Sequence, residues 1–189
     1  LGVRVINGSQ ATSIETNKAR QLDLLAGLGL QFPASRVVNH TSRITDAAAE
    51  LRFPVVVKVN IGGSGAGIVR FDTPAGLQAA VTAGQIDLGI DQTALVQEYV
   101  TPRGGHIHRV ETMAGKFLYA MKVYTTGESF NLCPAEICQI PDEPSADFCL
   151  TEAPKKGIKV EAFTPPAEVI AAVERIVAKA GIDVGGIEY

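Results

Sequence analysis

A run of apolar residues that ends in a lysine and continues into a glycine-rich loop constrains the fold of this 189-residue chain most strongly. Residues 53–60 read Phe-Pro-Val-Val-Val-Lys-Val-Asn, and residues 61–67 read Ile-Gly-Gly-Ser-Gly-Ala-Gly. The apolar run predicts a strand covered on both faces, so Lys58 needs a specific reason to lie at its end. A bound anion is such a reason, because glycines let several N–H groups approach an anion and the lysine adds a positive charge.

Lysine and loop together suggest a nucleotide phosphate site, although the order of the residues differs from the common phosphate-binding loops. The lysine precedes the glycines, and neither the Gly-Lys-Ser/Thr end of a P-loop nor the spacing of the dinucleotide fingerprint is present. A tight hairpin with a lysine at its edge explains the same residues equally well. The rest of the chain has to decide between the two interpretations.

Composition places the chain among ordinary globular proteins. It is 46% hydrophobic and 20% charged, with a net charge of −3, so it lacks the basic character of most nucleic-acid-binding proteins. No run reaches the roughly 18 apolar residues that span a bilayer, and the first residues lack the apolar core of a signal peptide. We therefore expect a cytoplasmic protein without nucleic-acid or membrane partners. Cys133, Cys138 and Cys149 form no CxxC pair and are expected to be reduced and packed.

Hydrophobic periodicity predicts a mixed chain of strands and helices. Strands are expected at residues 1–7, 37–38, 55–59, 68–71, 95–100, 107–113, 116–125 and 187–189, and helices at 14–29, 44–51, 73–83 and 164–181. Ala114 and Gly115 predict a hairpin turn. Residues 141–163 are rich in Pro, Asp and Lys and are expected to form a surface loop. A strand that starts at the last residues indicates a fragment.

Several motifs, in order, resemble the ATP-grasp superfamily, and most closely its ribosomal-protein glutamate ligase-like (RimK-type) carboxylate–amine ligases. Asn17-Lys18 resembles the pair that opens a helix in this family, and residues 53–68 resemble its "fPvVvKp...g..G.GV" segment. Residues 96–100, Val-Gln-Glu-Tyr-Val, resemble its hinge strand "vQeyi". The likeness continues through Gly104-Gly105, Arg109, Lys122 and Asn131 to residues 180–188, which resemble "aGiDvgGvD". It covers nearly the whole chain.

The resemblance implies an α+β fold of the ATP-grasp type, in which two α+β lobes grip a nucleotide, here truncated at both ends. Residues 1–16 would be a remnant of a preceding domain or a linker. Residues 17–100 would form the N-lobe with the glycine-rich lid and the hinge strand. Residues 101–189 would form an incomplete C-lobe.

The resemblance also implies ATP and Mg²⁺ as cofactors and assigns the nucleotide contacts. The lysines would hold the phosphates, the glycine loop would close over them, and backbone groups of the hinge strand would read the edge of adenine. The implied nucleotide-binding residues are Lys18, Lys58, Gly62, Gly63, Ser64, Gly65, Gln97, Glu98 and Val100. Without the resemblance, Lys18 would be interpreted as a surface charge, since a cation in a first helical turn opposes the helix dipole.

Metal and catalytic roles follow from the same resemblance. Glu188 takes the place of the first acidic magnesium ligand, and Asn131 matches an asparagine that we assign to the metal as well. Arg109 and Lys122 would stabilise the transferred phosphoryl group or the carboxylate, with cross-strand surface charges as the alternative.

The family's acidic ribose contact after Gly-Gly is replaced here by His106-Ile107-His108. The two histidines alternate on a strand and share a face, but two ligands without a third do not make a metal site.

The implied reaction is the ATP-dependent joining of a carboxylate to an amine through an acyl phosphate, with release of ADP and phosphate. Small-molecule and peptide substrates both stay open, as does self-association. One alternative is a catalytically inactive ATP-binding regulatory module of the same fold. A purely structural α/β domain is disfavoured by the order of the motifs. Because the family's Glu-x-Asn metal ligands would lie beyond Tyr189, the given fragment is expected to be inactive alone.

Overall fold

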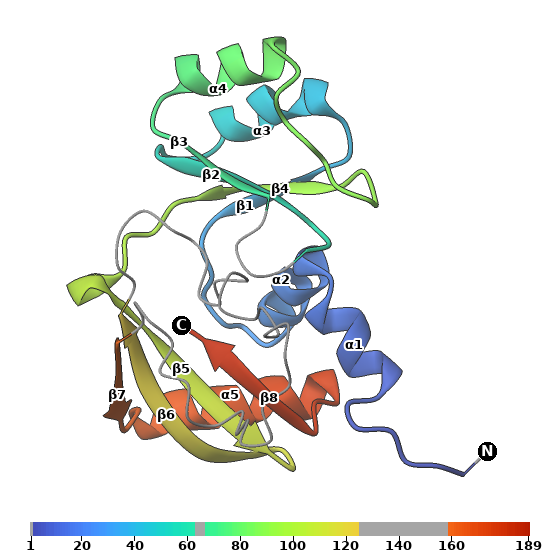
Figure 1. Cartoon of the computed structure of the whole chain (residues 1–189), viewed down its shortest axis with the longest axis vertical. Helices are drawn as coiled ribbons and strands as arrows, with labels where there is room; N and C mark the ends of the chain where they lie inside the picture. Colours follow the sequence, from blue (N-terminus) through green and yellow to red (C-terminus); the bar gives the residue numbers. More distant parts are fainter. Residues whose placement is uncertain (1, 63–66, 125–158) are drawn as a thin grey trace, which may run out of the picture.

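The computed structural model describes residues 2–62, 67–124 and 159–189, which contain two four-stranded antiparallel sheets (Figure 1). The first sheet has the order β1-β4-β2-β3, and its strands are β1 (Ser35–Val38), β2 (Val55–Val59), β3 (Ile68–Phe71) and β4 (Ala94–Glu98). The second has the order β7-β6-β5-β8, and its strands are β5 (His106–Met113), β6 (Lys116–Tyr124), β7 (Lys159–Phe163) and β8 (Val184–Glu188). The expected α+β class is confirmed.

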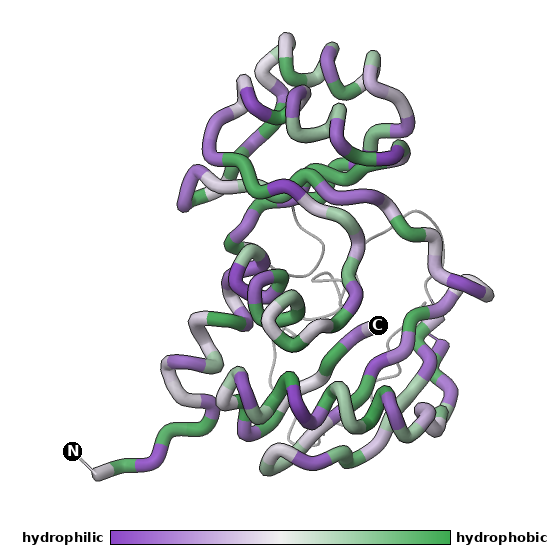
Figure 2. Tube along the Cα trace, turned by 180° about the vertical axis from the view of Figure 1, so that it is seen from behind, coloured by the Kyte–Doolittle hydropathy of each residue, from purple (hydrophilic) through white to green (hydrophobic). Residues whose placement is uncertain are grey.

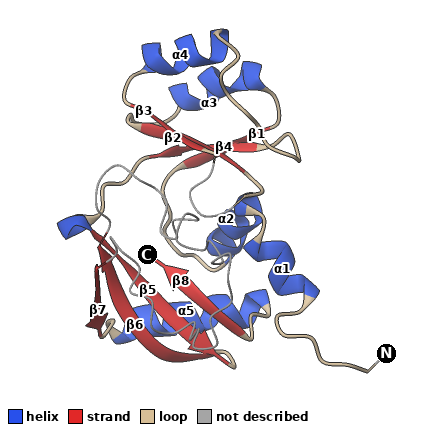
Figure 3. Cartoon of the chain, in the orientation of Figure 1, coloured by secondary structure: helices blue, strands red, loops and turns tan. Residues whose placement is uncertain are grey.

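Helices α3 (Ile44–Ala49) and α4 (Pro74–Thr82) cover one face of the first sheet (Figures 1 and 3). Val55 and Val57 of β2 are buried in the core that includes residues of both helices. Side chains alternate along a strand, so Lys58 lies on the opposite face. In Figure 1 that face is turned toward helix α2 (Lys18–Gly27) and the second sheet. Figure 2 shows the hydrophobic residues concentrated along these strands.

Thr73 caps the first turn of α4, because its side-chain oxygen accepts a hydrogen bond of 3.2 Å from the Gly76 N–H. Removing such a cap typically costs about 1 kcal/mol. Thr73→Ala is therefore expected to lower the free energy of unfolding by about 1 kcal/mol in urea denaturation. Thr73→Ser keeps the hydroxyl and serves as the control; an equal loss in both variants would contradict the capping role.

Helix α5 (Ala167–Ala180) packs on one face of the second sheet, and Figure 2 shows it from that side. Val173 of α5 contacts a core formed with Val110 and Ala120, against which Phe163 also packs. The helix ends at Gly181, whose φ of 71° is the left-handed conformation that glycine adopts without strain. Among the described residues, no helix combines the length and apolar character needed to cross a membrane.

Two expectations for the N-terminal part are wrong. Residues 2–8 form no strand, and Val3, Val5 and Ile6 are exposed, because no neighbouring strand pairs with them. The Asn7 side chain instead bonds the backbone of β8, donating to Val184 O at 2.7 Å. The helix expected at 14–29 is two helices, α1 (Ser9–Glu15) and α2, because Asn17 adopts an extended conformation and caps α2.

The remaining differences concern boundaries and one missed strand. Residues 159–163, expected within a surface loop, form β7, since they pair with β6 and make one edge of the second sheet. Strand β8 starts at Val184, earlier than expected, because it pairs with β5 over five residues. The strands at 55–59 and 68–71 have the expected bounds, and the hairpin at Ala114-Gly115 is confirmed by positive φ at both residues.

Candidate functional site

Lys58 is the centre of a polar group on the inner face of the first sheet. Its Nζ donates to Gln97 Oε1 at 2.7 Å, and Gln97 Nε2 donates to Ser35 Oγ at 2.7 Å. Ser35 in turn donates to the Pro33 carbonyl. Gln97 is 8% exposed, so this chain of bonds satisfies a buried amide and fixes its orientation. The predicted residues Lys58 and Gln97 are thus in direct contact.

Lys18 reaches the same end of β2 from the first turn of α2. Its Nζ donates to the carbonyl oxygens of Asn60 at 3.2 Å and Gly62 at 3.0 Å. The buried side chain of Asn60 accepts a bond of 2.9 Å from the Ala19 N–H and donates to Asp91 Oδ2 at 2.7 Å. Asn60 therefore joins the start of α2 to the end of β2 and fixes the position of Lys18.

The two lysines form a locally positive site. Burial, followed by the charge of Lys18, lowers the pKa of Lys58 to about 8. Burial also lowers the pKa of Lys18, and the Asp91 carboxylate opposes part of that shift. Among the described residues, neither ammonium group forms an ion pair with a carboxylate. A phosphate would supply the missing negative charge, which is why this arrangement favours an anion site.

The glycine-rich loop is described only at its two ends. Gly62 accepts the bond from Lys18, and Gly67 has a φ of 70°, as expected for a glycine in such a loop. A side chain at Gly67 would approach Val59 to 3.0 Å, so the position favours glycine for packing as well. The predicted residues Gly63, Ser64 and Gly65 lie outside the described residues, as do Asn131 and the three cysteines.

The predicted hinge lies where β4 leaves the first sheet. The Glu98 N–H donates to the Ala34 carbonyl at 2.9 Å, and the Glu98 carboxylate binds Arg52, with Oε2 at 2.9 Å from Nη2. Hydrogen bonds from Arg52 lower the pKa of Glu98. Within the described part of the chain, the Val100 N–H makes no hydrogen bond, and the residue is 61% exposed.

A second group lies on the sheet of the C-terminal half. Arg109 Nε is 2.6 Å from Glu111 Oε1, and its Nη1 is 2.9 Å from Glu188 Oε1. Burial lowers the pKa of Arg109, but the bonds and charges of both glutamates outweigh it and leave the pKa above its usual value. The guanidinium lies directly over Gly186, where a Cβ would come within 2.5 Å of Nη2. Arg109 and Glu188 are thus in contact.

Lys122 and Arg109, predicted to act together, lie on opposite faces of the second sheet. Arg109 pairs with Met121 and His108 pairs with Lys122, so the lysine shares the face of His108. Its Nζ is 5.6 Å from the ring centre of Phe163, which packs against the core under α5. The structure therefore does not bring Lys122 to Arg109.

The two histidines belong to an aromatic cluster. The His108 ring stacks on Phe163 at 4.2 Å and on Tyr189 at 4.9 Å between ring centres, and His106 lies 5.0 Å from both His108 and Tyr124. Burial, then the charges of His106 and Lys122, lowers the pKa of His108. Among the described residues, no three His, Cys, Asp or Glu side chains are grouped to hold a metal ion.

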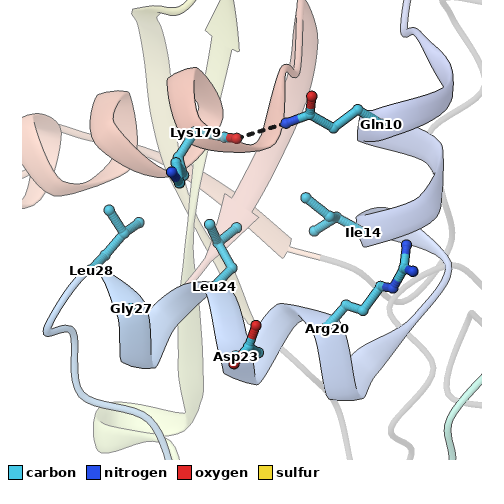
Figure 4. A pocket seen from close by; sticks show the side chains of 8 residues that line it. All are labelled: Gln10, Ile14, Arg20, Asp23, Leu24, Gly27, Leu28 and Lys179. Atoms are coloured by element: carbon cyan, nitrogen blue, oxygen red, sulfur yellow. Dashed lines mark hydrogen bonds between the residues drawn. The ribbon is translucent and has the colours of Figure 1, made fainter.

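A pocket of about 470 Å³ lies elsewhere, between α1, α2 and α5 (Figure 4). In Figure 4 the Gln10 side chain bonds the Lys179 carbonyl, at 2.9 Å, across one end of it. The lining residues are Gln10, Ile14, Arg20, Asp23, Leu24, Gly27, Leu28 and Lys179. None of the predicted site residues lines this pocket, so it is separate from the two polar groups.

Sequence reasoning missed four residues that hold the predicted ones. Asn60 and Asp91 fix Lys18, and Glu111 and Gly186 fix Arg109. Glu111 had a usable signal, since it lies two residues from Arg109 on a predicted strand and must share its face. No signal in the sequence indicates the role of Asp91, because its contact with Asn60 joins positions 31 residues apart.

The chain is similar to known proteins in sequence and in fold. A family model described as the RimK-like ATP-grasp domain matches residues 15–131. Two curated relatives named "Probable alpha-L-glutamate ligase" are similar over 123 residues, which are 65% of this chain and 40% of each relative. The one from Teredinibacter turnerae is 32% identical and the one from Thioalkalivibrio sulfidiphilus 33%. The matched segment thus spans about 40% of the relatives' length.

Solved structures are similar over the whole chain. The RimK domain protein ATP-grasp from Sphaerobacter thermophilus has a TM-score of 0.65 at 19% identity, covering 99% of this chain and 57% of that one. D-alanyl-alanine synthetase A from Vibrio cholerae has a TM-score of 0.67 at 16% identity, covering 99% and 55%. The ATP-grasp ligase PsnB, complexed with minimal precursor, Mg and ADP, has a TM-score of 0.63 at 20% identity, covering 99% and 49%.

Proposed function

Because the chain belongs to the RimK-like ATP-grasp family, we propose that it is the nucleotide-holding part of an ATP-dependent carboxylate–amine ligase. The observation that carries this proposal is the pair Lys18 and Lys58, two partly buried ammonium groups at the edge of a glycine-rich loop. Such a pair suits the phosphates of ATP. The lobes would be residues 17–100 and 101–189, consistent with a sheet on either side of residue 100.

Adenine would bind at the end of β4. Val100 is exposed and its N–H makes no hydrogen bond within the described part of the chain, so the N–H is available as a donor to a ring nitrogen. The carbonyl of Glu98 would accept from the exocyclic amine. Because Arg52 holds the Glu98 side chain, this part of the backbone has a defined position. These contacts use backbone atoms, which fits the exposed Val side chain at residue 100.

Magnesium would bind beside Glu188, with Asn131 as a further ligand. The donor set fits the ion in type, since carboxylate oxygens are the ligands that Mg²⁺ prefers, and Glu111 lies on the same face of the sheet. No group of three such side chains occurs among residues that the structure describes, so phosphate oxygens and water would complete the coordination. When bound, the ion neutralises charge on the phosphates. Glu188 would exchange its Arg109 contact for the ion.

The reaction would begin when a carboxylate oxygen of the substrate attacks the γ-phosphorus of ATP, breaking its bond to ADP. The amine nitrogen would then attack the carbonyl carbon of the acyl phosphate, expelling phosphate and losing a proton. Lys18 and Lys58 would hold the phosphates, and Arg109 would balance charge on the transferred group. The names of the relatives suggest glutamate as a substrate of this chain as well.

One observation favours a second candidate, an ATP-binding module without turnover. Lys122 lies on the face opposite Arg109, so one of the two proposed catalytic cations is turned toward α5. A module of this kind would bind nucleotide and leave it intact.

Isotope transfer tests the ligase proposal. Because this fragment is expected to be inactive alone, the longest available form of the protein is used. It is incubated with Mg-ATP and L-glutamate labelled with ¹⁸O in its carboxylates, so that glutamate serves as both carboxylate and amine. Acyl phosphate formation predicts that released inorganic phosphate carries ¹⁸O. ADP release without label in phosphate would contradict the acyl phosphate, and nucleotide binding without ADP release would favour the module.

Nucleotide affinity is expected to depend on pH above 8. Free Lys58 has a pKa of about 8, and a bound phosphate raises it, so binding takes up a proton at higher pH. The dissociation constant for Mg-ADP should therefore rise between pH 8 and pH 9.5, by up to about tenfold per pH unit. Lys58→Arg, which stays charged, is the control and should remove this part of the dependence. A wild-type affinity that is flat over this range would contradict the assignment.

A further inference from the structure

The Asp91 carboxylate is connected to the lysine site through Asn60, and one of its oxygens has no hydrogen-bond partner in the described part of the chain. Its Oδ2 accepts the bond of 2.7 Å from Asn60, while its Oδ1 is buried and has no hydrogen-bond partner among the described residues. A buried, unpaired carboxylate oxygen is costly unless a nearby positive charge offsets it. Lys18 is that charge, since the electrostatic interaction between the two groups is favourable.

Asp91 also holds the backbone around Lys18. The Asn60 amide that it orients accepts the Ala19 N–H at 2.9 Å, and the Asn60 carbonyl accepts Lys18 Nζ at 3.2 Å. The Asp91 carbonyl accepts from the Thr93 hydroxyl, and the Thr93 carbonyl accepts the Asn60 N–H. The loop before β4, the end of β2 and the start of α2 are thereby joined through Asn60 and Asp91.

We propose that Asp91 is a positioning residue of the anion site: it fixes Lys18 through Asn60, and its negative charge favours the ammonium form of Lys18 in the presence of the second cation, Lys58. This inference rests on the proposed nucleotide function. Two cations at one site repel each other, and each favours loss of the other's proton. The Asp91 carboxylate, which interacts favourably with Lys18, offsets part of that repulsion.

In the described part of the chain, the charge of Asp91, from the loop before β4, acts on Lys18, and the charge of Lys18 acts on Lys58, from β2. Asp91→Asn removes the charge but keeps an oxygen that can accept from Asn60. In the variant, Lys18 should lose its proton at lower pH than in the wild type. At pH 6.5 both lysines remain charged, and the loss of the carboxylate removes a repulsion on the incoming phosphates.

The experiment measures the dissociation constant of Mg-ADP for the wild-type chain and Asp91→Asn at pH 6.5 and pH 9. The ratio of variant to wild type is used because the titration of ADP itself cancels in it. We expect a ratio near or below 1 at pH 6.5 that increases at least about threefold by pH 9, the effect of a lowered lysine pKa. A purely structural role would give the same ratio at both pH values and would overturn the proposal.

Three further variants separate the outcomes. Asp91→Glu keeps the charge and should show the wild-type dependence of the Mg-ADP dissociation constant on pH. Asp87→Asn, in the same loop, removes a carboxylate that accepts only the Gly89 N–H at 2.8 Å in the described contacts, and it should leave the profile unchanged. Lys18→Met should weaken the dependence of the Mg-ADP dissociation constant on pH. If this pH dependence is the same in Lys18→Met and the wild type, the proposal is overturned, even where Asp91→Asn fails to fold. Failure of the wild type to bind Mg-ADP would refute the nucleotide function itself.

Discussion

Replacing Lys58 with methionine is expected to abolish most nucleotide binding while making the protein more stable. The lysine supplies a partly buried, charge-assisted contact to phosphate, whose loss should weaken Mg-ADP binding roughly 100-fold. Without ligand, the same ammonium is unfavourable, because its pKa is about 8 in the folded chain and 10.5 as a free side chain. That difference corresponds to roughly 3 kcal/mol at neutral pH.

The gain is reduced because Gln97 Oε1 loses its donor, at a cost of about 1–2 kcal/mol, so the expected net stabilisation is about 1–2 kcal/mol. The folded-state pKa is lowered, so wild-type stability should rise from pH 8 to pH 10.5, and the variant should lack this rise. Calorimetry and urea denaturation measure both effects. Lys116→Met removes an exposed lysine with its ion pair to Glu174, so it should leave Mg-ADP binding unchanged and alter stability by less than about 1 kcal/mol. A Lys58→Met chain that binds Mg-ADP like the wild type would contradict the site.

Adding one methyl group at Gly186 is expected to displace Arg109 and destabilise the second sheet. A Cβ there would lie 2.5 Å, 2.7 Å and 2.8 Å from Nη2, Cζ and Nε of the guanidinium, closer than non-bonded atoms approach. The guanidinium would have to shift, and the shift would weaken its contacts with Glu111 and Glu188. We expect Gly186→Ala to lower the free energy of unfolding by about 1–3 kcal/mol.

A double-mutant cycle shows whether the clash with Arg109 is the cause. In an Arg109→Ala background the guanidinium is absent, so Gly186→Ala should cost much less, and the two changes should be strongly non-additive. Gly27→Ala, in helix α2 with no atom within 4 Å of the added Cβ, is the matched control. It should stabilise the protein by up to about 1 kcal/mol. If the changes in the free energy of unfolding caused by Gly186→Ala and Arg109→Ala are fully additive, the clash with Arg109 is not the cause of the destabilisation.

Local patterns predicted the elements with strong periodicity and failed where tertiary contacts decide. The valines of β2 and the turn at Ala114-Gly115 carry their own signals, and both were correct. Residues 2–8 have the apolar content of a strand but pair with none, which no local pattern reveals. Residues 159–163 lie at the end of a polar segment, and local patterns do not predict their strand because it forms by pairing with β6.

The candidate site was predictable as far as the family motifs reach. These motifs identify Lys18, Lys58 and Gln97. In the structure, Lys18 bonds the Asn60 carbonyl just after β2, and Lys58 of β2 bonds Gln97 of the neighbouring strand β4. The contact between Arg109 and Glu188, 79 residues apart, depends on the pairing of β5 with β8, which local sequence patterns do not specify. The face of Lys122 depends on strand register, which a motif alone does not fix.

Titration of Mg-ADP into the unmodified chain at pH 7, followed by calorimetry, tests the central claim most directly. The proposal that Lys18 and Lys58 form a nucleotide phosphate site predicts saturable binding of one nucleotide per chain, with heat that disappears when Mg-ADP is replaced by magnesium and adenosine. Circular dichroism establishes that the chain is folded. The absence of saturable Mg-ADP binding by the folded chain would contradict the nucleotide site and leave the fold alone established.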